Sequence, residues 1–545
     1  MRGRAPEASV EERAPSFLAE VETALQSLTT AASRAEWQAS TTGTEAARDD
    51  AARAEVALRG FLSDGDRYAR IRALLDAPGL KDPQLRRRLE LLALDHLPNQ
   101  LPESIIFDLV RRGKEIEAEF YNFRAELDGR PVTDNEIIAI LRTERHPQRR
   151  RAVWEASKQI GPRVADRLVE LVKRRNAAAR TLGYRDYYAL QLHLQQIDEP
   201  ELLGLFHELK ALTDRPFQRA KTELDRRIAR RFRVRPEALK PWHYEDPFFQ
   251  EPPLSSELGL APFFRNADLV GIAERFFAGV GLPVGDVLER SDLEERPGKD
   301  QHAYCTHIDR EGDVRVLCNL KANDRWMGIL LHELGHAAYD KFIPRDLAWT
   351  LRQPPHTATT EAIAMFMDRL PYDLDWVVAV TGRRPSDGDG LADRLTNALR
   401  FEMLLMARWV PVMTLFERAL YAAPESNDLA GLWWDLVEEY QRVPRPEGRS
   451  APDWAAKIHL TVAPVYYHNY LLGELIASQL KAALDRELGD GNARGYVGRP
   501  ELGDFLRARV FAPGARLHWQ EHLRRATGAP LGIAAFAQHF VGSGA

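Results

Sequence analysis

The segment LLHELGHAAYD, residues 330–340, contains the side chains of this chain that are best suited to chemistry. His332 and His336 are four positions apart, so on an α-helix both imidazoles project from one face and can bind the same metal ion. Glu333 is rotated by about 100° from His332, which brings its carboxylate beside that ion, where it can take a proton from water. The alternative is a pair of helix histidines that bond to solvent or backbone. The spacing favours a zinc site.

A third protein ligand is expected elsewhere, because catalytic zinc keeps three protein ligands and one open position. In PPHTATTEAIAMFMDRL, residues 354–370, two prolines end one segment and the threonines can cap a new helix. Glu361 lies near the start of that helix, and Asp368 lies seven residues later on the same face. We predict Glu361 as the third ligand of one zinc ion, and Asp368 as a carboxylate that bonds the far nitrogen of a zinc-binding histidine. Taken alone, Glu361 fits equally well as an acidic residue at a helix N-terminus.

Phenol and imidazole side chains gather in AAKIHLTVAPVYYHNYLLGEL, residues 455–475. Amide hydrolysis needs hydrogen-bond donors where the carbonyl oxygen becomes an oxyanion, and both groups can donate. The alternative is a tyrosine-rich helix that packs its rings and leaves its hydroxyls at the surface. The zinc motif favours the first interpretation. The members of the group are Tyr466, Tyr467, Tyr470, His459 and His468.

The elements that must position these groups are mostly helices, because apolar residues recur at three- and four-residue intervals along the chain, as in FLAEVETALQSL. Residues 302–320, HAYCTHIDREGDVRVLCNL, depart from this pattern and predict two short strands around a turn at REGD. A hairpin directly before the zinc motif offers an edge to an extended peptide, and we assign His307 to substrate binding there. A hairpin that only closes the core fits this segment equally well.

Composition excludes several classes of function. The chain has 545 residues, of which 44% are hydrophobic, and its formal net charge of −5 gives no basic field for nucleic acid. No run approaches the ~18 apolar residues of a membrane span, and the N-terminal residues lack the apolar run of a signal peptide. Because the chain has only two cysteines, we expect a cytoplasmic protein. We expect its partners to be oligopeptides, not nucleic acid or a membrane. Cys305 and Cys318 could form a disulfide, but two buried thiols are favoured.

Taken together, these segments resemble the gluzincin peptidases of the angiotensin-converting-enzyme and oligopeptidase group. That group shares HExxH, a glutamate about 25 residues later on the next helix, and a downstream His/Tyr segment. Residues 35–47, AEWQASTTGTEAA, and residues 136–161 resemble segments of the converting enzymes. Residues 239–250, LKPWHYEDPFFQ, are closer to the thimet oligopeptidase and oligoendopeptidase F relatives.

The resemblance also implies roles for individual residues. It implies zinc on His332, His336 and Glu361, with Glu333 as the general base, and it matches Asp368 to an acidic residue of the oligopeptidases. The segment KIH…YYHNY is similar to the substrate-binding segment of the converting enzymes. The roles implied there are binding of a C-terminal carboxylate by Lys457 and Tyr467, a bond from His459 to a peptide carbonyl, and oxyanion stabilisation by Tyr470, with Tyr466 in the same substrate-binding set.

Two further positions compare with the converting enzymes. Asn469 stands where that family has an arginine that holds chloride. Cys305 and Cys318 fall where those enzymes have a disulfide beside the strand that pairs with substrate.

These observations predict a mainly α protein with two helical lobes around a deep active-site cleft and a small β-sheet beside the HExxH helix. Residues 1–545 would form one metallopeptidase unit, with 12–130 as an N-terminal lid portion and 131–545 as the remaining lobes. The zinc site would lie in residues 302–370 and the substrate-binding segment in 455–475.

The predicted function is zinc-dependent hydrolysis of short oligopeptides with release of C-terminal dipeptides. The alternatives are an oligoendopeptidase that cleaves internal bonds, a processing enzyme for one cellular peptide, and a non-catalytic peptide-binding protein that retains zinc. Lys457 distinguishes release of C-terminal dipeptides from cleavage of internal bonds, because a cation that binds a terminal carboxylate favours the exopeptidase. Glu333 argues against the non-catalytic protein, because a structural zinc site needs no base.

Overall fold

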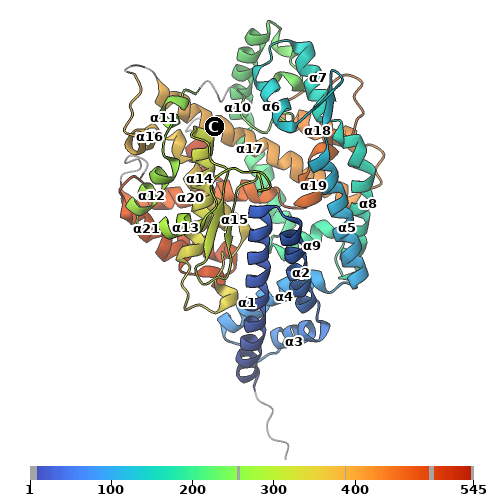
Figure 1. Cartoon of the computed structure of the whole chain (residues 1–545), viewed down its shortest axis with the longest axis vertical. Helices are drawn as coiled ribbons and strands as arrows, with labels where there is room; N and C mark the ends of the chain where they lie inside the picture. Colours follow the sequence, from blue (N-terminus) through green and yellow to red (C-terminus); the bar gives the residue numbers. More distant parts are fainter. Residues whose placement is uncertain (1–8, 254–257, 387, 389, 490–495, 542–545) are drawn as a thin grey trace, which may run out of the picture. The chain divides into compact units, whose positions relative to one another are not determined.

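Helices make up most of the chain, and strands form only two small hairpins among the described residues (Figure 1). The computed structural model describes residues 9–253, 258–386, 388, 390–489 and 496–541. The predicted mainly α fold is confirmed. Contacts between Cα atoms divide the chain into two compact units, each made of three segments. Unit 1 comprises residues 1–100, 260–389 and 473–531, and unit 2 comprises residues 101–259, 390–472 and 532–545.

Unit 1 contains the helix with the HExxH motif. This helix, α14 (Asp324–Phe342), begins where the Asn323 side chain accepts a hydrogen bond from the Trp326 backbone N–H. It packs along α15 (Thr357–Asp368), whose first turn is capped by His356. The other helices of unit 1 with at least six residues are α1 (Val10–Thr42), α2 (Glu45–Leu62), α3 (Gly65–Leu75), α4 (Pro83–His96), α12 (Leu269–Gly279), α13 (Gly285–Arg290), α16 (Leu374–Thr381), α21 (Pro500–Leu506) and α22 (Trp519–Thr527).

The predicted hairpin before the zinc motif is confirmed. Strand β3 (Tyr304–His307) pairs antiparallel with β4 (Val314–Leu317), and both strands pack against α14. In the turn between them, the Ile308 backbone N–H donates to the Asp313 carbonyl, and Gly312 adopts a left-handed φ of 114°. Cys305 and Cys318 are both free thiols. The disulfide implied by the resemblance is therefore not formed in this structure.

Unit 2 contains most of the predicted substrate-binding segment. Its helices of at least seven residues are α5 (Glu103–Asn122), α6 (Asp134–Thr143), α7 (Pro147–Ser157), α8 (Ile160–Thr181), α9 (Tyr187–Leu194), α10 (Glu199–Phe232), α17 (Leu391–Ala422), α18 (Leu429–Gln441) and α23 (Ala534–Phe540). Unit 2 also contains a hairpin of two strands, β1 (Ala125–Leu127) and β2 (Arg130–Val132). The short helix α19 (His459–Val462) lies within the predicted substrate-binding segment. The division between the units falls inside helix α20 (His468–Leu488).

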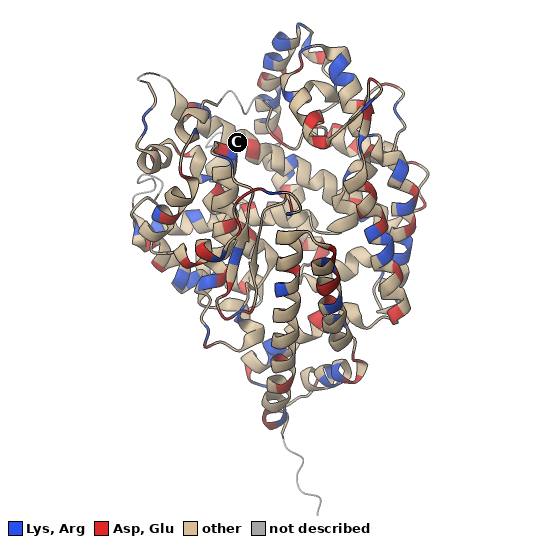
Figure 2. Cartoon of the chain, in the orientation of Figure 1, with Lys and Arg blue, Asp and Glu red and all other residues tan. Residues whose placement is uncertain are grey.

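Both units expose mixed charge. Figure 2 shows acidic and basic residues interspersed along the helices of each unit. Within the described residues, no helix combines the length and the apolar character needed to cross a bilayer. The cleft between lobes, and the division of one metallopeptidase unit at residues 130 and 131, stay predictions.

Candidate metal and substrate-binding sites

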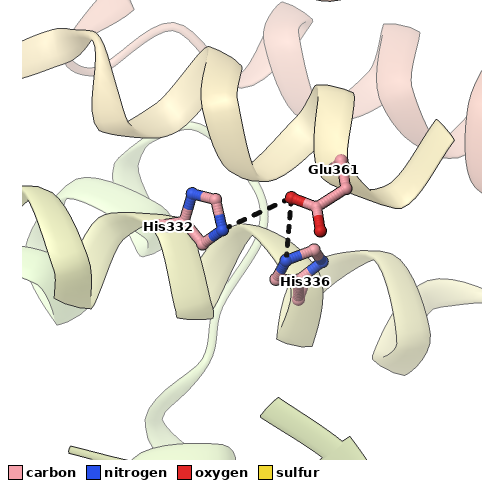
Figure 3. A group of neighbouring side chains, drawn as sticks. All are labelled: His332, His336 and Glu361. Carbon is pink, nitrogen blue, oxygen red and sulfur yellow. Dashed lines mark ion pairs between the residues drawn. The ribbon is translucent and has the colours of Figure 1, made fainter. Parts of the chain in front are cut away.

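Three side chains of unit 1 converge on one point (Figure 3). The Nε2 atoms of His332 and His336 lie 3.6 and 3.9 Å from the same oxygen, Oε2 of Glu361. All three potential ligand atoms lie within 4.8 Å of one another. Two imidazole nitrogens and one carboxylate oxygen are the donor set of catalytic zinc, which binds such atoms at about 2.0–2.2 Å. The donor set therefore fits one zinc ion.

The helices that carry these ligands approach each other closely. At Gly335, between the two histidines, an added Cβ would lie only 2.8 Å from the Ala364 Cα of α15. Helix α20 also approaches α15: a Cβ at Gly473 would lie 3.1 Å from the Glu361 Cβ and 2.9 Å from the Met365 Sδ. Glycine at these two positions allows three helices to pack tightly enough to bring Glu361 to the histidines.

Each ring is also held by its second nitrogen. His332 Nδ1 lies 2.8 Å from the Asp368 carboxylate, and His336 Nδ1 lies 2.7 Å from the Thr360 hydroxyl. With a proton on Nδ1, both rings donate these bonds and direct the lone pair of Nε2 toward the common point. The predicted contact of Asp368 is therefore present. Thr360 was not predicted, although it directly precedes Glu361 in the sequence.

The two histidines differ in their electrostatic surroundings. Burial alone would lower the pKa of His332, but its bond to Asp368 and the charges of Asp368 and Glu333 raise that pKa to about 9. His336 has only a neutral hydroxyl behind it, and burial, with a smaller effect of His332, lowers its pKa to about 3. Asp368 therefore makes His332 the more basic ligand, while His336 is neutral and ready to bind metal at physiological pH.

Glu333 lies buried beside the metal ligands. Burial raises the pKa of this carboxyl to about 7, although His332 and the Cys305 backbone N–H act in the opposite direction. A carboxyl group with a pKa near the working pH both accepts and returns a proton efficiently. Glu333 thus has the environment that a general base requires.

A buried ion pair lies next to Asp368. The guanidinium of Arg369, the residue after Asp368, pairs with the Glu474 carboxylate of α20. It also reaches the Glu474 carbonyl at 3.3 Å and the Ser478 hydroxyl at 3.5 Å. This pair links the end of α15 to α20 and so fixes the backbone from which Asp368 projects. Sequence reasoning did not find it, because a separation of 105 residues carries no local signal.

His307 lies on β3 of unit 1, as predicted. Its Nε2 accepts the Gly312 backbone N–H at 3.1 Å, and burial lowers its pKa to about 4. This nitrogen therefore stabilises the hairpin turn as a neutral acceptor. A substrate contact of His307 stays a prediction.

Unit 2 brings the predicted carboxylate-binding residues together. Lys457 Nζ donates to the side-chain oxygen of Gln250 at 2.5 Å, and the Tyr467 hydroxyl lies 3.5 Å from the same atom. Trp409 Nε1 donates to the Tyr467 hydroxyl at 3.2 Å. Gln250 was not singled out from the sequence, although it ends the LKPWHYEDPFFQ segment. The lysine ammonium and the phenol hydroxyl are donors suited to a carboxylate, and in this structure the amide oxygen of Gln250 is their common acceptor.

The remaining predicted residues lie around Tyr467. The His459 ring centroid is 5.0 Å from that of Tyr467, and the Tyr470 centroid is 5.4 Å from it. Tyr466 packs against Tyr470 at 5.3 Å. The structure thus gathers four of the five tyrosines and histidines of the substrate segment into one cluster, and their roles in catalysis stay predictions.

Comparison with known proteins relates part of the chain to a family. Residues 8–214 match the angiotensin-converting enzyme family. The predicted resemblance to that family is confirmed over this segment, which ends before the HExxH motif, so the geometry of the metal site is an independent observation. No curated protein matches the chain. The likeness to the thimet oligopeptidase and oligoendopeptidase F relatives stays a prediction.

Asn469 lies outside the segment that matches the family. Asn469, which stands in place of the chloride-holding arginine, is fully buried, and its amide donates to the side-chain oxygen of Gln195 at 2.8 Å. The same oxygen lies 3.0 Å from His468 Nε2. The Gln195 side-chain oxygen therefore lies within hydrogen-bond distance of both Asn469 and His468.

Proposed function

We propose that the protein is a zinc-dependent metallopeptidase that hydrolyses short oligopeptides and releases C-terminal dipeptides. The observation that carries the proposal is the convergence of His332, His336 and Glu361 with both Nδ1 atoms held from behind. Zinc, when bound by these residues, supplies a Lewis acid that polarises the scissile carbonyl and lowers the pKa of water. The match to the angiotensin-converting enzyme family supports a peptidase.

The chain's own residues move the proton and stabilise charge. Glu333 takes a proton from the attacking water and passes it to the leaving amine. Tyr470, with His459, donates hydrogen bonds to the oxyanion of the tetrahedral intermediate. This division of roles assigns Glu333 to proton transfer and leaves metal binding to the other three residues.

The surroundings of Lys457 support release of dipeptides. Its side chain is buried at 6% exposure, and among the described residues its ammonium forms no ion pair. Its hydrogen-bond partner is the neutral Gln250, and the rings of Phe248, Trp409 and Tyr467 lie 5.3–5.5 Å away. A buried cation without a carboxylate is costly. The free carboxylate of a peptide's C-terminus would provide the missing partner.

The proposal includes oligopeptides as the partners, with neither nucleic acid nor a membrane, and a cytoplasmic location. The test is mass spectrometry of products from a mixed peptide library in which each peptide occurs as a free acid and as a C-terminal amide. The zinc-loaded parent should remove dipeptides from the free acids, and a strong chelator should abolish this activity. Glu333→Gln should bind zinc normally and release no product.

Each alternative outcome has a distinct meaning. Cleavage at internal bonds at equal rates in both forms of each peptide would make the protein an oligoendopeptidase. Zinc binding without cleavage by the parent would leave the non-catalytic peptide-binding protein as the explanation. Absence of bound zinc in a folded protein would overturn the metallopeptidase itself.

A further inference from the structure

The backbone is strained at one residue of the substrate-binding segment. Val465 has a φ of +56°, in the left-handed region, and its side chain is 1% exposed. This conformation is unusual for any residue other than glycine and is most costly for a β-branched one. Such residues persist only where the surrounding structure holds them, and they concentrate at functional sites. Val465 directly precedes Tyr466 and Tyr467, so its backbone sets the direction in which both rings leave the chain.

Side chains from two helices hold both polar groups of this residue. The Val465 backbone N–H donates to the Glu417 carboxyl of α17 at 2.8 Å, and the Val465 carbonyl accepts from Gln195 Nε2 at 2.9 Å. Gln195 follows α9 and also accepts from Asn469 through its oxygen. One half-buried glutamine therefore binds the segment both at the strained residue and four residues later.

A third helix holds the segment on the side before Val465. The Arg175 guanidinium of α8 donates to the carbonyls of Leu460 and Thr461 at 3.1 and 2.8 Å. It also donates to the Tyr421 hydroxyl at 3.1 Å. The segment from Leu460 to Asn469 is thus bound at several points, and only at Val465 does the contact hold an unfavourable backbone conformation.

We propose that Glu417 is a positioning residue of the substrate-binding segment, which holds Val465 in the left-handed conformation so that Tyr467 meets Lys457 and Gln250. This inference rests on the proposed function, since the arrangement it maintains is the proposed carboxylate site. Glu417 touches neither substrate nor metal in this account, and it acts through the backbone of Val465.

The chemistry of Glu417 determines which substitution should be tolerated. Burial raises its pKa to about 8, although the Val465 N–H and Arg175 act to lower it. Glu417 is therefore largely neutral at pH 7 and acts as a hydrogen-bond acceptor without charge. Glutamine has the same shape, the same acceptor and no charge, so it should replace Glu417, whereas alanine should not.

The experiment compares Glu417→Gln and Glu417→Ala in the zinc-loaded full chain, with matched free-acid and amidated peptides. Glu417→Ala should raise KM for free acids about tenfold, equivalent to the loss of one good contact, and change the amidated peptides little. Glu417→Gln should stay within about twofold of the parent. Zinc affinity of both variants, measured by chelator competition, should equal that of the parent, which shows that unit 1 is folded.

Two further measurements separate this inference from the proposed function. Adding Val465→Gly to Glu417→Ala should recover part of the KM loss, because glycine adopts the left-handed conformation without strain. If the parent cleaves no peptide, the proposed function fails, and hydrogen exchange at residues 463–467 still tests the inference: exchange should be faster in Glu417→Ala and unchanged in Glu417→Gln. Equal exchange rates in all three proteins, or a KM for Glu417→Ala equal to that of the parent, would overturn it.

Discussion

Substitution of Gly335 by alanine tests how closely α14 and α15 must approach. The new Cβ would lie 2.8 Å from the Ala364 Cα and 3.1 Å from both the Ala364 N and the Ile363 carbonyl oxygen. All three are backbone atoms, which cannot rotate away as a flexible side chain can. Relief therefore requires the helices to separate locally by roughly 0.6 Å to reach ordinary van der Waals contact.

This separation acts directly on the metal ligands. His332 and His336 lie on one helix and Glu361 on the other, so separating the helices moves Glu361 away from the histidines. Metal–ligand distances tolerate changes of only about 0.2 Å. We expect Gly335→Ala to weaken zinc binding at least about tenfold. Overpacking should destabilise the metal-free protein by about 1–3 kcal/mol, of which better helix propensity recovers up to about 1 kcal/mol.

The same helix provides a matched control. Gly328 lies seven residues, or about two turns, before Gly335 on α14, and a Cβ there would have the Asp368 carbonyl oxygen as its nearest contact at 4.0 Å. Gly328→Ala should therefore keep zinc affinity and gain slightly in stability. Zinc affinity is measured by competition with a chelator, and stability by urea unfolding of the metal-free protein. If Gly335→Ala bound zinc as tightly as Gly328→Ala, close packing at Gly335 would not be needed for the metal site.

Three other predictions follow from named contacts. Asp368→Asn removes the charge behind His332 and should lower zinc affinity about 10- to 100-fold in the same competition assay, while an unchanged affinity would exclude that role. Lys457→Met should raise KM about 10- to 100-fold for free-acid peptides and leave KM for amidated peptides unchanged. It should also raise the melting temperature of the ligand-free protein, because it removes a buried charge. Equal KM effects on both peptide forms would contradict the role of Lys457. The parent should lose stability as pH rises from about 4.5 to about 8, by up to about 1.4 kcal/mol per pH unit, because folded Glu417 keeps a proton that the unfolded chain releases. Urea unfolding at several pH values should show a flatter dependence for Glu417→Gln over this range, and identical slopes would rule out the raised pKa.

The arrangement of the candidate metal ligands could be predicted from the sequence because their geometry is local. Four residues of helix fix the relation of His332 to His336 whatever the rest of the fold does. The prolines and threonines before Glu361 mark a helix start, and seven further residues place Asp368 on the same face. The turn signal at REGD likewise predicts the hairpin of β3 and β4. In each case the deciding interactions lie within a few residues.

The residues that hold these groups could not be predicted, because their partners are distant in the sequence. Gln250 meets Lys457 across 207 positions, and Glu417 meets Val465 across 48. Local preference points the wrong way at Val465, since a β-branched residue favours an extended backbone and gives no sign of a left-handed one. Thr360 is the intermediate case: its place beside a metal ligand is visible in the sequence, but its bond to His336 depends on the packing of α15 on α14.

The buried lysines of this chain show why Lys457 matters for the choice between exopeptidase and endopeptidase. Lys221, at 2% exposure, donates to both oxygens of Asp225, and Lys299, at 4%, donates to Asp292 at 2.8 Å. Those ammonium groups are neutralised by carboxylates of the protein, as expected for lysines with a structural role. Lys158 is held over the Phe248 ring with no carboxylate in hydrogen-bond contact among the described residues, and burial lowers its pKa to about 7. Lys457 shares the burial but donates to an amide oxygen, which cannot neutralise it. A carboxylate that arrives with the substrate would complete the same kind of pair that the fold builds for Lys221 and Lys299, and this is the reason for proposing a peptidase that binds free C-termini.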